Sequence, residues 1–115
     1  MATIIGNMVR DENKVTTVTW GPMSQAAGDV GRGAIVGDLI ERSVQAIGTN
    51  TNTVAIQGSN DGTNWGALGA GITLTIGATN TSPITALPIN AKYIRPATPS
   101  AGTDTIVIFC GTAAR

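Results

Sequence analysis

The sequence predicts an all-β protein, an antiparallel β-sandwich or jelly-roll-like domain of about seven or eight short strands. Three observations lead to this fold class. Thr is spread along the whole chain and, with Val and Ile, favours half-buried pleated surfaces. Glycine occupies 15 and proline 5 of the 115 positions, and turn signals return about every ten residues, the spacing typical of sandwiches. Apolar and polar residues alternate cleanly across Ile72–Ile76, which indicates a half-buried strand.

The N-terminal segment 1–13 is predicted to be an arm or a short edge strand. It starts apolar at Ile4 and Ile5 and turns polar by residue 10. Residues 15–20 are rich in β-formers and predict a strand, which Gly21-Pro22 should end.

The stretch 23–38 carries Gly28, Gly31, Gly33 and Gly37. A helix through it would lose about 1 kcal/mol at each glycine relative to Ala. We therefore expect an irregular loop, with a short strand at 34–36.

The middle of the chain predicts two hairpins. Residues 43–47 and 53–57 should pair as antiparallel strands around the polar turn 49–52. The run Val54–Leu68 then reads as strand, tight turn and strand, because Asp61-Gly62 is a strong hairpin signal.

Three segments follow toward the C-terminus. Residues 84–89 lie between Pro83 and Pro88, which confines them to an edge or a loop. Residues 92–95 predict a short strand. Residues 105–111 are apolar on both faces and should form a central strand.

The length predicts one domain over residues 1–115, large enough to bury about two thirds of its unfolded surface. No internal repeat or linker is present. The N-terminus has no basic region followed by an apolar stretch, and no apolar run reaches membrane-spanning length. We expect a protein that is made and assembled in a host cytoplasm and does not bind membranes.

Charge is scarce and balanced. Only 12% of residues are charged, and seven basic residues offset seven acidic ones. No basic run exists that could neutralise several phosphates, which argues against a nucleic-acid partner. A surface so poor in charge lacks the usual protection against association. We expect much of it to be buried against other subunits, the alternative being a monomer kept in solution by Thr, Asn and Ser.

The residue types of most active sites are missing. The chain has no histidine and only one cysteine, Cys110, in an apolar strand where a buried and inert thiol is expected. The carboxylates are scattered among loops. Gly28–Gly33 lacks the ending of a phosphate-binding loop, and Asn60–Asn64 lacks the terminal Glu of a calcium loop. The sequence predicts a protein that is not an enzyme and holds no cofactor or metal.

Few aromatic residues are available for a functional surface. Exposed rings of Trp20, Trp65 and Tyr93 would suit a sugar-binding face. The alternative, which we favour, is that Trp20 and Trp65 join Phe109 in a small core, where each ring buries a large area. The cations of the strands, Arg42, Lys92 and Arg95, are expected to pair with acids across the sheet.

Three segments, Glu41–Gly48, Val54–Trp65 and Lys92–Pro96, resemble in order and spacing a group of small tailed-bacteriophage structural proteins. The resemblance covers roughly residues 39–115 and implies a β-rich virion component of the capsid decoration (cement) type. It implies no catalytic residues.

The resemblance implies a protein of the capsid surface of the virion, whose partner is the major capsid protein. A homotrimer would match the threefold positions of an icosahedral shell. Two alternatives stay open: a tail, neck or fibre module, and a carbohydrate-binding sandwich. The candidate interaction residues are Ile4, Ile5, Trp20, Trp65, Tyr93 and Arg95.

Overall fold

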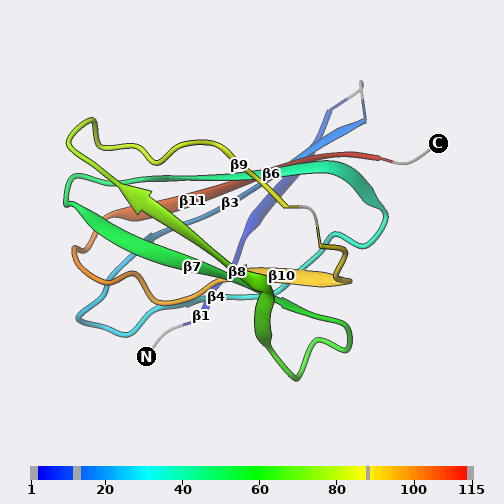
Figure 1. Ribbon diagram of the computed structural model, residues 1–115, viewed down its shortest axis with the longest axis horizontal. Coiled ribbons are helices and arrows are strands. Elements are labelled where there is room, and N and C mark those ends of the chain that lie inside the picture. Colours follow the sequence, from blue (N-terminus) through cyan, green and yellow to red (C-terminus); the bar gives the residue numbers. More distant parts are fainter. Residues whose placement is uncertain (1–2, 12–13, 88, 114–115) are drawn as a thin grey trace.

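The computed structural model describes residues 3–11, 14–87 and 89–113, and it confirms the all-β prediction. Two sheets pack face to face, with β3, β6 and β11 in one layer and β7, β8 and β10 in the other (Figure 1). Every regular element in the described ranges is a strand, so no helix there could span a membrane. Seven strands have four or more residues, and four further strands have two residues each.

The larger layer is a five-stranded antiparallel sheet in the order β2-β3-β11-β6-β9. Its strands are β2 (Asn7–Arg10), β3 (Val15–Met23), β11 (Thr105–Ala113), β6 (Leu39–Ile47) and β9 (Thr85–Ala86). The apolar strand β11 is central, as predicted, and the proline-flanked β9 lies at an edge, also as predicted. The N-terminal segment contributes the opposite edge, β2.

The second layer has four strands in the order β5-β10-β7-β8. Its members are β5 (Ala34–Ile35), β10 (Tyr93–Pro96), β7 (Asn52–Ser59) and β8 (Gly66–Ile76). A parallel pair, β1 (Thr3–Ile4) with β4 (Val30–Gly31), joins the N-terminus to the glycine-rich stretch. That stretch is irregular apart from two short strands, in line with the expectation for 23–38.

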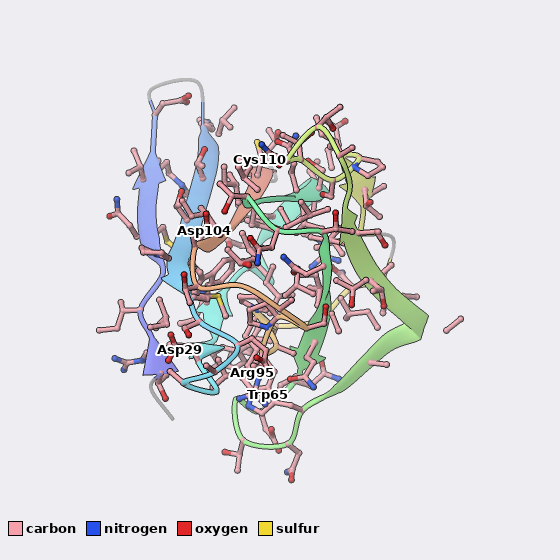
Figure 2. The ribbon with its side chains drawn as sticks, turned by 90° about the vertical axis from the view of Figure 1, so that its left-hand side faces the viewer. Asp29, Trp65, Arg95, Asp104 and Cys110 are labelled. Atoms are coloured by element: carbon pink, nitrogen blue, oxygen red, sulfur yellow. The ribbon has the colours of Figure 1, made fainter. Side chains whose placement is uncertain are left out.

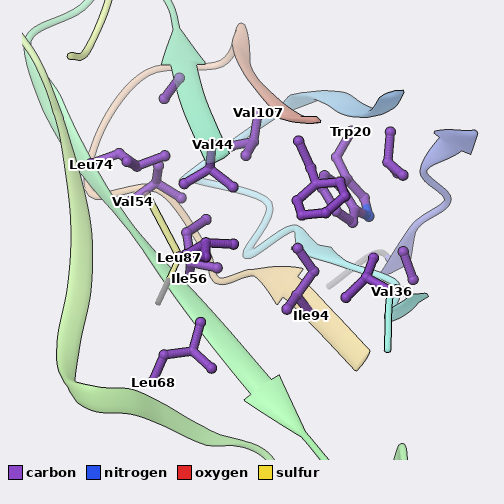
Figure 3. Close-up of a cluster of buried hydrophobic side chains, with 14 of the residues drawn as sticks. Trp20, Val36, Val44, Val54, Ile56, Leu68, Leu74, Leu87, Ile94 and Val107 are labelled. Carbon is purple, nitrogen blue, oxygen red and sulfur yellow. The ribbon is translucent and has the colours of Figure 1, made fainter. Parts of the chain in front are cut away.

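The hydrophobic core lies between the two sheets (Figure 3). Alternate residues of β3, β6 and β7 point into it, so burial along most of each of these strands has period two. The largest fully buried side chains are Trp20, Phe109, Met23, Ile56, Leu74, Ile76, Ile94, Val18, Val36, Val44, Val54 and Val107.

The predicted hairpin between residues 43–47 and 53–57 is wrong. Strand β6 pairs with β11 and β9, whereas β7 pairs with β8 and β10, so the two segments belong to different sheets. The connection between β6 and β7 forms hydrogen bonds to residues of other segments and does not form a hairpin turn. Gly48 N donates to the Asn80 carbonyl, and the Thr49 amide and hydroxyl donate to the Asp104 carboxylate.

Strand β3 continues past its predicted end at Gly21-Pro22, and the peptide bond between these residues is cis. The register with β11 shifts at this point, because Met23 opposes Thr105 while Trp20 opposes Val107. Two residues of β3 thus face one of β11, a bulge that accommodates a proline inside the strand.

Candidate interaction surface

Exposed aliphatic side chains gather where the edges of the two sheets meet. Ile5, Met8 and Ile35 are 69%, 48% and 58% exposed, and together they line a hollow of about 290 Å³. Met8 lies on edge strand β2 and Ile35 on edge strand β5. Neither strand has a neighbour on its outer side in the described residues, so backbone donors and acceptors are also open there.

A second, more polar hollow of about 660 Å³ shares Ile35 with the first. Its polar walls come from Asp38, Asn60, Asn90 and Lys92. The two hollows therefore form one side of the molecule, apolar at the N-terminal edge and polar toward the β7–β8 turn.

The neighbouring residues Ile4 and Ile5 have opposite orientations. Ile4 is half-buried and packs against the core, while its carbonyl accepts the Arg32 amide at 2.7 Å. Ile5 is largely exposed beside Met8. Of the predicted apolar pair, Ile5 is therefore the residue that a partner can reach.

Trp20 is wrong as a candidate interaction residue. Its side chain has no exposed surface, and its indole Nε1 donates to the Arg32 carbonyl at 2.8 Å. The ring is a core residue whose one polar atom is satisfied inside the protein, as buried tryptophans require.

Trp65 and Arg95 lie together, and Figure 2 shows them side by side at one end of the molecule. The Arg95 guanidinium carbon is 4.4 Å from the centroid of the Trp65 ring. A Cβ added at Gly33 would lie 2.5 Å from the same ring, so only glycine allows this close approach. Trp65 is consequently half-buried, covered by Arg95 and by the backbone at Gly33.

Tyr93 is also half-buried, with the Lys92 ammonium 5.5 Å from its ring centroid. A cation therefore already lies over one face of the Trp65 ring and one face of the Tyr93 ring. The expected core of three aromatic residues is correct for Trp20 and Phe109, while Trp65 lies at its margin.

The arginines expected to pair with acids have other partners. Arg95 Nε donates to Gln57 Oε1 at 2.9 Å on the neighbouring strand, and burial lowers the pKa of Arg95. Arg42 donates to the Ile89 carbonyl. Arg10 and Asp38 form an exposed ion pair at 3.4 Å, and Asp38 lines the polar hollow.

The β7–β8 connection runs from Ser59 to Gly66 and is longer than the predicted tight turn. Hydrogen bonds to the Asp61 side chain hold its conformation. The Asp61 carboxylate accepts the amides of Thr63 and Asn64, each at 2.8 Å, and the hydroxyl of Ser59 at 2.9 Å. These hydrogen bonds lower the pKa of Asp61 well below its usual range, the Asn64 amide having the largest effect. No group of three or more His, Cys, Asp or Glu residues in the described part of the chain could hold a metal ion.

Cys110 is half-exposed, which corrects the expectation of a buried thiol. On β11 the odd-numbered Val107 and Phe109 point into the core, so Cys110 points to the outer face between Thr17 and Ser43. An apolar sequence around a cysteine did not reveal this orientation.

The sequence also missed Met8 and Ile35 as surface residues. Met8 lies in the predicted N-terminal arm and Ile35 in a predicted short strand. Their common exposure becomes visible only in the structure, where β2 is the edge strand of one sheet and β5 the edge strand of the other.

Comparison with known proteins supports the fold alone. No family model and no curated protein matches the chain. It is similar to a cupin domain from Bordetella pertussis at 9% identity and a TM-score of 0.53, covering 98% of this chain and 96% of the other. An RmlC-like cupin protein from Desulfovibrio desulfuricans has 13% identity and a TM-score of 0.47, covering 96% and 82%. The first similarity supports a jelly-roll-like β-sandwich.

Proposed function

We propose that this chain is a non-enzymatic virion protein that decorates the outer surface of a bacteriophage head and stabilises the shell. The observation that carries the proposal is the apolar edge formed by Ile5, Met8 and Ile35. Contiguous exposed apolar surface is typical of a protein–protein interface. The resemblance of three segments to small phage structural proteins supports a major capsid protein as the partner.

The structure suits a protein whose role is to bind and hold its partners without a chemical reaction. Two packed sheets form a rigid body that can hold several binding edges in fixed positions. Each contact with a capsid subunit can be weak, because contacts made by one trimer add through effective concentration. The low charge of the chain, 12% of residues, limits the desolvation cost of covering its surface.

The test uses particles of the phage whose genome encodes the chain. We expect the protein in purified heads, and we expect heads that lack it to release DNA at a lower temperature. Adding the purified protein back should restore the heat resistance. The Ile5→Asp variant should fail to restore it, whereas Ile84→Asp, a change at an equally exposed residue outside this edge, should succeed. Absence of the protein from heads would refute the proposal.

Tail, neck or fibre association is the first alternative, and electron microscopy of labelled particles separates it from head decoration. A carbohydrate-binding function is favoured by one observation, the polar hollow walled by Asp38, Asn60, Asn90 and Lys92. It predicts a change of tryptophan fluorescence when a glycan binds. Binding to no member of a broad glycan array would count against it.

A further inference from the structure

Arg42 is a buried cation that has no acidic partner among residues 3–11, 14–87 and 89–113. It lies on β6, on the same inward side as Val44, and is only 6% exposed. Its Nη2 atom donates to the Ile89 carbonyl, and the Leu87 amide donates to the Arg42 carbonyl at 2.9 Å. Its Nη1 atom is buried and has no hydrogen-bond partner among the described residues.

Such an arrangement is costly for an isolated protein. Charged side chains are almost never fully buried unless they are paired, and a buried guanidinium with an unmet donor loses hydration without compensation. Burial lowers the pKa of Arg42, yet arginine stays protonated in proteins. The positive charge therefore persists, and no acidic side chain in the described part of the chain neutralises it.

A hollow of about 460 Å³ adjoins this side chain. Its walls combine the apolar Ile40 and Leu87 with the amide of Asn90, and Glu41 also lines it. A planar carboxylate can take two parallel hydrogen bonds from one guanidinium. A dianion such as phosphate is less suited, because a single arginine faces it and Glu41 contributes a negative charge.

We propose that the hollow beside Arg42 binds a carboxylate carried on an apolar chain, supplied by an acidic side chain of a partner protein or by a small carboxylic acid. The carboxylate completes the hydrogen bonding of the guanidinium. Since Nη1 has no exposed surface, the ligand reaches it by displacing the rim of the hollow. The proposal goes beyond the capsid role and does not depend on it.

The surroundings suit a protein partner. Ile40, two residues before Arg42 on β6, is 49% exposed, and Ile89, whose carbonyl accepts a hydrogen bond from the Arg42 guanidinium, is 44% exposed. A buried arginine surrounded by aliphatic side chains is typical of the residues that dominate interface energies.

The experiment is an NMR titration of the whole chain with two probes. One is propionate, with propanol as its neutral control. The other is the peptide acetyl-Leu-Glu-Leu-amide, with the Gln peptide as its control. We expect the acids to shift the Arg42 side-chain resonances and the amides of Leu87 and Asn90, and the neutral probes to leave them unchanged.

The Arg42→Met variant should weaken binding of the acids at least about tenfold, the value of one hydrogen bond to a charged group. Its melting temperature should equal or exceed that of the wild type, since apolar replacements of buried charges are often neutral or stabilising. Arg95→Met, which removes the arginine bound to Gln57, is the matched control and should leave the titration unchanged.

The two probes distinguish the sources. Tighter binding of the Glu peptide points to a partner protein, and binding of propionate that is equal or tighter points to a small carboxylic acid. If neither acid shifts the Arg42 resonances, the proposal is overturned. It is also overturned if Arg42→Met lowers the melting temperature while wild-type and variant respond alike to the acids, because Arg42 would then have a purely structural role.

Discussion

The Asp61 carboxylate joins the two ends of the β7–β8 turn, and its acceptor role makes the stability of the protein depend on pH. Hydrogen bonds from Asn64, Thr63 and Ser59 lower the pKa of Asp61 below its ordinary value of 3.8. This contribution is complete above pH 3.8. As the pH falls further, the unfolded chain takes up a proton before the native protein does, and the contribution is lost.

We therefore expect Asp61→Asn to lower the melting temperature at pH 7 and to reduce the fall in melting temperature of the wild type between pH 4 and pH 2. Thermal unfolding followed by circular dichroism at a series of pH values measures both effects. Thr63→Ala, which keeps the backbone donor, is the control and should retain the wild-type pH dependence. Parallel curves for Asp61→Asn and wild type would contradict this role.

The two tryptophans should respond differently to removal. Trp20→Ala should cost about 3–5 kcal/mol of unfolding free energy, because it empties a fully buried site. Trp65→Ala should cost about 1–2 kcal/mol, since the ring is half-buried and its main loss is stacking with Arg95. Urea unfolding gives both values. Equal costs would show that Trp65 belongs to the core.

Within the β7–β8 connection, Gly62 and Gly66 form a matched pair. Gly62 has a φ of +78°, and an added Cβ would lie 3.3 Å from the Tyr93 ring, whereas Gly66 has open space around it. Gly62→Ala should destabilise the protein by about 1–2 kcal/mol through the left-handed conformation. Gly66→Ala should change stability little. Urea unfolding measures both changes in unfolding free energy. Equal losses for the two variants would show that the left-handed conformation of Gly62 is not what limits the substitution.

At the level of elements, local signals in the sequence predicted strands better than their partners. Apolar residues on both faces correctly predicted a central strand at 105–111, and Pro83 and Pro88 correctly predicted an edge. The pairing of 43–47 with 53–57 failed because alternation shows which face of a strand is buried, but not which sheet it joins. That assignment depends on contacts distant in sequence, such as Asp104 with Thr49.

The candidate site was predictable in part for the same reason. Ile5 is apolar near the terminus and could be picked out directly. Its neighbours Met8 and Ile35 come from different sheets, so their common surface appears only when the sheets are packed. The burial of Arg42 could not be predicted, because nothing in the order of residues shows that this charged side chain points inward.

For the molecule as a whole, we expect the apolar edge to contribute to contacts between subunits as well as to the proposed contact with the capsid. Under the proposed function the protein forms trimers, and light scattering on a sizing column measures the mass. Ile5→Asp combined with Met8→Lys should shift the mass toward that of a monomer while leaving the melting temperature of the isolated subunit nearly unchanged, because both residues are exposed. Ile84→Asp serves as the control. A wild-type monomer would contradict the trimer, and a trimer whose mass the double change does not alter would place the subunit interface elsewhere.

The central position of β11 has a consequence for how the protein is made. Synthesis delivers β3 and β6 first, yet they do not pair with each other. Both pair with β11, whose residues 105–113 are translated long afterwards. Until then the growing chain carries two strands with open edges, the condition under which nascent β proteins aggregate. Yield in the cell should thus be limited by the interval before the last strand is translated, and chaperones that cover strand edges should act during that interval.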